Sequence, residues 1–119
     1  MATEFLMQSN LAANSYNDLM TDADTGESQV RFITRPSRVT MAVVASAVGI
    51  TLEIQSGGRT VVPRSTLEAG GTTGVFPNLS DKAFSFMAAG GEKLRVALTE
   101  IAGVATVDVM ATIDVTAIA

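Results

Sequence analysis

The chain has 119 residues, a formal net charge of −4, and neither cysteine nor histidine. This length is typical of one domain built around a single hydrophobic core. Without cysteine or histidine, the sequence excludes disulfides, thiolate metal sites and catalysis by the usual thiol nucleophile or imidazole base. Acidic side chains outnumber basic ones in both halves of the chain. This argues against a nucleic-acid partner, because surfaces that bind phosphates carry a basic stripe.

No segment predicts membrane insertion or secretion. The sequence lacks any run approaching the roughly 18 apolar residues of a membrane-spanning helix, and MATEFLMQSN has neither a basic start nor a continuous apolar core, so we expect no signal peptide. Only 17% of residues are charged, whereas 47% are hydrophobic. One interpretation is a neutral surface rich in Thr, Ser and Gly; the other is a surface partly covered by neighbouring subunits, since interface cores are depleted in charge.

Residues 1–29 are predicted to form an irregular N-terminal arm, separate from a β-sandwich domain over residues 30–119. Asn, Asp, Ser and Gly dominate this segment, and these residues favour turns. A short helical turn over residues 11–19, capped by Ser9 or Asn10, is compatible with it. The arm either closes one end of the sandwich or packs on a neighbouring subunit, with Phe5 and Leu6 as anchors. Residues 22–27 lack the full ligand pattern of a calcium loop, so we expect an acidic turn and no metal.

Strands are predicted over residues 30–34, 38–48, 50–55 and 59–64. The Gly-Gly pair at 57–58 lies between two alternating runs, which indicates a hairpin because tight turns need positive φ. Pro63 places the second strand of this hairpin at a sheet edge, since proline cannot donate to a ladder.

The second half of the chain predicts a loop over residues 66–77, with Val75 and Phe76 turned inward. Strands follow at 83–87, with Phe84 and Phe86 in the core, at 92–100 and at 106–118. Seven to eight short antiparallel strands separated by regular turn signals are typical of a β-sandwich. We therefore expect an all-β, single-domain, jelly-roll-like sandwich.

The terminal strand has one apolar face, formed by alternate residues from Val107 to Val115. Its other face carries Asp108, Met110, Thr112, Asp114 and Thr116. The two carboxylates would lie about 20 Å apart along a strand, too far for a catalytic pair. We expect this face to be solvated or pressed against a neighbouring subunit, and we assign no catalytic, cofactor-binding or metal-binding residue.

Six of the eight basic residues are arginines, a preference that suits ion pairs between subunits, although ordinary surface arginine is the alternative. Arg35 and Arg38 flank a turn at Pro36 and are the best placed to reach a neighbour. With Phe5, Leu6 and Met110, they are the predicted interface residues.

Two segments carry a resemblance: SGGRTVVPRSTLEAGGTTGVFPN at 56–78 and GGEKLRVALTEIAGVATVDVMATIDV at 90–115. Over about residues 50–118 the chain resembles the small β-sandwich virion structural proteins of tailed bacteriophages, of the capsid cement, decoration or head-fibre type. The resemblance implies a non-enzymatic protein of the virion that self-associates, as a trimer or a pentamer, or binds a major capsid protein, without a cofactor.

Two other classes of function remain open at this point. The chain could be a receptor-binding, glycan-binding or tail and neck adaptor module of a phage fibre, although one Tyr and no Trp offer few aromatic platforms for sugars. An enzyme would have to draw its acid and base from Asp, Glu, Lys or Tyr alone.

Overall fold

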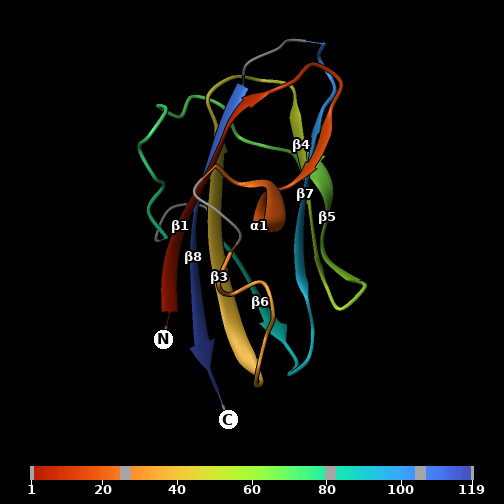
Figure 1. The fold of residues 1–119 in the computed structure, drawn as a ribbon, viewed down its shortest axis with the longest axis vertical. Helices are drawn as coiled ribbons and strands as arrows, with labels where there is room; N and C mark the ends of the chain where they lie inside the picture. Colours follow the sequence, from red (N-terminus) through yellow and green to blue (C-terminus); the bar gives the residue numbers. More distant parts are fainter. Residues whose placement is uncertain (1, 25–27, 80–82, 104–106, 119) are drawn as a thin grey trace.

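The computed structural model describes residues 2–24, 28–79, 83–103 and 107–118. Figure 1 shows two layers of strands, with a short helix between them at one side. The described strands are β1 (Ala2–Leu11), β2 (Tyr16–Asp18), β3 (Ser37–Ala45), β4 (Ile50–Ser56), β5 (Arg59–Thr66), β6 (Phe84–Ala88), β7 (Leu94–Glu100) and β8 (Val107–Ala117), and the helix is α1 (Leu19–Asp22).

The strands form two antiparallel sheets of four. Sheet A has the order β1-β8-β3-β6 and sheet B the order β2-β7-β4-β5. The first strand pairs with the last, the second with the seventh, the third with the sixth and the fourth with the fifth. This nested pairing is a long antiparallel hairpin rolled into two layers, the arrangement of a jelly roll. The predicted β-sandwich is confirmed.

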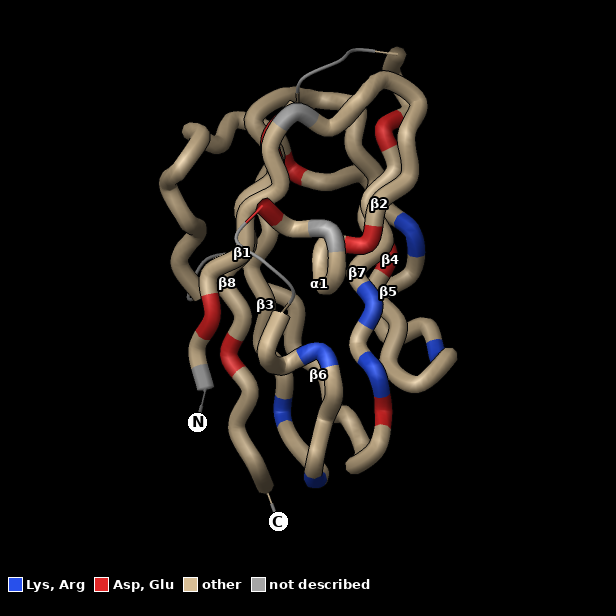
Figure 2. The backbone as a smooth tube through the Cα atoms, viewed as in Figure 1, with Lys and Arg blue, Asp and Glu red and all other residues tan. Residues whose placement is uncertain are grey.

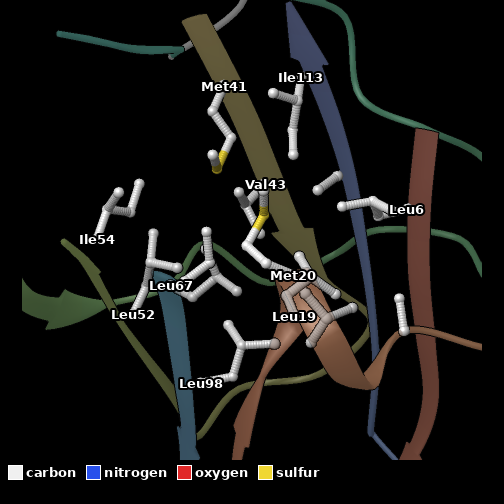
Figure 3. Close-up of a cluster of buried hydrophobic side chains, with 14 of the residues drawn as sticks. Leu6, Leu19, Met20, Met41, Val43, Leu52, Ile54, Leu67, Leu98 and Ile113 are labelled. Carbon is white, nitrogen blue, oxygen red and sulfur yellow. The ribbon is translucent and has the colours of Figure 1, made fainter. Parts of the chain in front are cut away.

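The core lies between the inner faces of the two sheets. Figure 3 shows Met41 and Ile113 of sheet A opposite Leu52, Ile54 and Leu98 of sheet B, and all five side chains are fully buried. The apolar face of β8 is part of this core, as its alternation predicts, because Val107, Val109, Ala111 and Ile113 are also buried.

The hairpin predicted from the Gly-Gly pair at 57–58 is confirmed as the connection between β4 and β5 of sheet B. β4 and β5 pair through a turn at Gly57 and Gly58, and both glycines have positive φ. β5, which contains Pro63, is one of the two edge strands of sheet B, as expected from a residue that cannot donate to a ladder.

The prediction of an irregular arm is wrong for residues 2–11. These residues form β1, which pairs along most of its length with β8, from Ala2 opposite Val115 to Leu11 opposite Val107. Leu6 faces the core, while Phe5 points to the outer side of sheet A and contacts Phe76 of a long loop. Both faces of the strand therefore have apolar contacts, which erases the alternation that marks a half-buried strand.

The strand predicted over residues 30–34 is also wrong. Its one ladder contact is a bridge between Phe32 and Lys93. Around that bridge, the Leu94 N–H donates to the Arg31 carbonyl at 2.7 Å and the Ile33 N–H donates to the Glu92 carbonyl at 2.8 Å. The segment thus pairs with the beginning of β7 and then turns away at Pro36 into β3.

The edge of sheet B beside β7 is consequently made of two separate pieces. β2 pairs with residues 97–99 of β7, and residues 31–33 pair with its beginning. Between them, Asp18 Oδ1 accepts the N–H of Val96 at 3.1 Å and the N–H of Met20 at 3.1 Å. The carboxylate that caps α1 also completes the edge of the sheet. The helical turn expected over residues 11–19 lies instead at Leu19–Asp22.

Candidate functional site

The loop after β5 lies on the outer face of sheet A (Figure 1, green). Its backbone joins the end of β3, where the Ala45 N–H donates to the Glu68 carbonyl at 2.9 Å and the Gly71 N–H donates to the Ala45 carbonyl at 3.0 Å. Further along, the Thr112 hydroxyl donates to the Pro77 carbonyl at 2.6 Å. Residues 68–79, which we call the covering loop, are therefore fastened to both central strands of sheet A.

The covering loop accounts for the second face of β8. That face was expected to be solvated or to contact a neighbouring subunit. Met110 and Thr112 are instead buried by the chain itself, and the Thr73 hydroxyl donates to the Asp108 carboxylate. Near the other end of β8, Asp114 accepts a hydrogen bond from Thr3 at 2.9 Å. Both aspartates have structural hydroxyl partners.

Exposed apolar side chains remain on this outer layer. Phe5 is 53% exposed and its ring lies 5.3 Å from that of Phe76 in the covering loop. Val75, expected to point inward, is 60% exposed, and Met87 on β6 is 48% exposed. Phe84 and Phe86, on the opposite face of β6, pack against the core as expected.

The predicted interface residues divide into two groups. Phe5, Arg35 and Arg38 are exposed, so each is accessible to a partner. Leu6 and Met110 are buried inside the chain, at 2% and 0% exposure, so their prediction as interface residues is corrected. Leu6 lies in the core of the sandwich, and Met110 lies under the covering loop, where Gly71 approaches it closely.

The outer face of sheet B has a different chemistry. A hollow of about 440 Å³ is lined by polar, charged and glycine residues, namely Asp18, Gln55, Gly57, Gly58, Lys93 and Arg95. The next hollow, of about 230 Å³, is lined by Tyr16, Thr51, Glu53, Arg64, Ala97 and Thr99. The two adjoin, because Gln55 pairs with Arg95, Glu53 with Ala97 and Thr51 with Thr99 along consecutive outward positions of β4 and β7.

Three cationic side chains contact aromatic rings at this face. The Arg31 guanidinium lies 5.0 Å, and the Lys93 ammonium 5.8 Å, from the centre of the exposed Phe32 ring. The Arg95 guanidinium lies 5.2 Å from the centre of the exposed Tyr16 ring and donates to its hydroxyl. Each such contact is attractive because the face of an aromatic ring is electron-rich.

Sequence reasoning missed Tyr16, Phe32, Lys93 and Arg95. The alternation of Lys93 and Arg95 with buried Leu94 and Val96 was a readable signal that both cations point outward. The aromatic partners come from segments far away in the sequence, so only the fold places them there.

A separate ion pair lies at the β4–β5 turn. Arg59 donates to Glu92 at 2.9 Å, and the Ala89 N–H donates to the same carboxylate at 2.6 Å. The hydrogen bond from Arg59 is the main reason that the pKa of Glu92 lies below its usual range, and Glu92 in turn raises the pKa of Arg59.

Within the described ranges, no three acidic side chains gather as metal ligands do. The acidic turn at residues 22–27 lies partly outside those ranges; its Asp24 carboxylate accepts the N–H of Ser9 at 2.9 Å. Among the described residues, no helix has the length and apolar character needed to cross a membrane.

The fold places the chain in the class of eight-stranded jelly-roll β-sandwiches. Comparison with protein-family models, with curated proteins and with solved structures found no match.

Proposed function

We propose that this chain is a non-enzymatic structural protein of a bacteriophage virion, which self-associates or binds the capsid shell through the outer face of sheet A. The observation that carries the proposal is the cluster of Phe5 and Phe76, which joins β1 to the covering loop and leaves Phe5 half exposed. Aromatic side chains in such settings are the usual anchors of protein interfaces.

The composition of the layer supports the same proposal. The outward side chains of sheet A include few charges, of which Asp108 and Asp114 already accept hydrogen bonds from threonines. Val75 on the covering loop and Met87 on β6 are further exposed apolar side chains of this layer. A weakly charged, partly apolar face is suited to burial against another protein.

The architecture is a further argument by analogy. Jelly rolls form many viral capsid domains, and they also form lectins, so the fold alone does not select a function. The sequence resemblance to phage cement, decoration and head-fibre proteins favours the capsid role. Arg35, in the turn before β3, and Arg38, on β3, are both exposed and are available for ion pairs with such a shell.

The test is co-sedimentation of the purified chain with shells assembled from the major capsid protein of the same phage. The double variant Phe5→Ser/Met87→Ser removes two apolar contacts from the proposed layer, and we expect it to stay in the supernatant. Val48→Ser is the matched control, because Val48 is 71% exposed in the turn between β3 and β4. Equal pelleting of the double variant and wild type would contradict the assignment of this face.

A further inference from the structure

The outer face of sheet B carries features that the proposed shell contact does not use. Its two adjoining hollows extend from the rung of Gln55 and Arg95 to the rung of Thr51 and Thr99. Four residues along a strand correspond to about 13 Å. The two hollows lie end to end over this length, and we call them together the groove. Sheet B, which carries the groove, lies on the side of the sandwich opposite the covering loop (Figure 1).

The groove exists because the central strand carries a small side chain at its middle. Ala97 is outward-facing yet only 7% exposed, because it lies at the floor between the larger Arg95 and Thr99. Tyr16, from the edge strand β2, rises beside this floor with 52% of its surface exposed. Polar groups from β2, β4 and β7 therefore converge on the groove, as polar groups do where a protein fixes the orientation of a ligand.

The first hollow has a positive side. Lys93, directly before β7, and Arg95 on β7 are both exposed, and both line it. In the described part of the chain, the contacts of both cations are with aromatic rings, Phe32 for Lys93 and Tyr16 for Arg95. Figure 2 shows basic segments along this strand. Two cations held in place by neutral rings favour an anionic group between them.

The two hollows also contain an amide, a glycine turn and an aromatic ring with a hydroxyl group. Gln55, whose amide nitrogen also donates to Glu53 at 3.1 Å, offers an amide next to the cations. Gly58 leaves open space at the same hollow, because no atom lies within 4 Å of the position that a Cβ would take there. Tyr16 offers an apolar ring with a polar tip at the second hollow. We propose that the outer face of sheet B binds an acidic oligosaccharide, with the carboxylate of one sugar between Lys93 and Arg95 and the adjoining sugar along Tyr16.

Two other classes of anionic ligand fit less well. Nucleic acid needs a continuous basic stripe, whereas Asp18 and Glu53 line the same groove. An acidic peptide bound by strand addition needs an open sheet edge. The edge beside β7 is occupied by β2, by Asp18 and by residues 31–33.

The test is calorimetric titration of the full chain with oligogalacturonate, sialyllactose and a hyaluronan oligosaccharide. Methyl-esterified oligogalacturonate is the uncharged control, and oligo-dT and polyglutamate represent the other two classes. We expect at least one acidic oligosaccharide to bind and the esterified form to bind at least about tenfold more weakly, the loss expected from one charge-assisted hydrogen bond.

Variants then locate the site. Lys93→Gln/Arg95→Gln should weaken binding by at least about tenfold. Arg38→Gln, which removes an exposed arginine from the other sheet, should leave binding unchanged. Failure of every acidic oligosaccharide to bind, tighter binding of oligo-dT or polyglutamate, or equal loss in the Arg38 variant would each overturn the proposal. Because the proposed shell contact uses the opposite face, these results are independent of the co-sedimentation test.

Discussion

The hydroxyl of Thr112 donates to the carbonyl oxygen of Pro77 at 2.6 Å, which fastens the covering loop to the centre of β8. Thr112 is 4% exposed, so its hydroxyl is removed from water, and Pro77 is partly buried. A buried carbonyl without a partner costs free energy comparable to a lost hydrogen bond. This hydrogen bond thus helps to hold the covering loop on the outer face of sheet A.

Replacement of this threonine tests how strongly the loop is fastened. We expect Thr112→Val to lower the free energy of unfolding by about 1–2 kcal/mol, because the Pro77 carbonyl loses its partner. Urea denaturation followed by circular dichroism measures the change. Thr116→Val is the control, since Thr116 is partly exposed and bonds Asp114 two residues away. Equal stability of wild type and Thr112→Val would show that the loop does not depend on this bond.

A substitution at Gly71 tests how closely the covering loop packs against Val44 and Met110. A Cβ at this position would lie 3.0 Å from Val44 Cγ1 and 3.1 Å from Met110 Cε. We expect Gly71→Ala to destabilise the protein by about 1 kcal/mol, because Val44 sits on a strand and cannot move freely. Gly90→Ala, with its nearest contact at 3.4 Å, should change stability less. A larger loss in the Gly90 variant would contradict this account of the loop.

A substitution at Asp18 tests its role in the edge of sheet B beside β7, between β2 and residues 31–33. Asp18→Ala removes the acceptor of both the Met20 and Val96 N–H groups, and we expect a loss of about 1–2 kcal/mol in unfolding free energy. Asp18→Asn keeps a side-chain oxygen and should lose less. Amide hydrogen exchange provides the local readout: protection at Val96 should fall in the alanine variant. Unchanged protection would contradict the role of the carboxylate.

The Arg59–Glu92 pair predicts a pH dependence. Because Arg59 lowers the pKa of Glu92 in the folded state, the pair stabilises the fold at pH values above the ordinary glutamate pKa, about 4.3. This contribution is lost as pH falls through the lowered folded-state pKa and the carboxylate becomes protonated. We expect Arg59→Gln to move the pKa of Glu92 upward, as measured by carbon-detected NMR titration. The same pKa in wild type and variant would refute the coupling.

The sequence was most informative for strands in which core side chains alternate with mostly polar side chains of the opposite face. β8 and β4 alternate in hydrophobicity, and Pro63 marks an edge, because burial on one side imposes a period of two. β1 escaped this reasoning because Phe5, Leu6 and Met7 are consecutive apolar residues. Their pattern is explained by the covering loop, which supplies a second apolar contact that only the tertiary structure reveals.

The candidate sites, too, could be predicted from the sequence only in part. Phe5 was identified from its residue type and remains exposed, whereas Met110 was assigned to the wet face of a strand that the chain itself covers. The groove on sheet B depends on Tyr16 and Arg95, which are 79 residues apart. Their contact follows from the pairing of β2 with β7, a long-range match that local sequence does not encode.

The most direct test of the proposed function is the molar mass of the wild-type chain, measured by size-exclusion chromatography with light scattering, alone and after incubation with capsid shells. The proposal predicts a trimer or a pentamer of the free chain, or a monomer that elutes with the shells. A chain that stays monomeric by itself and elutes separately from the shells would contradict it.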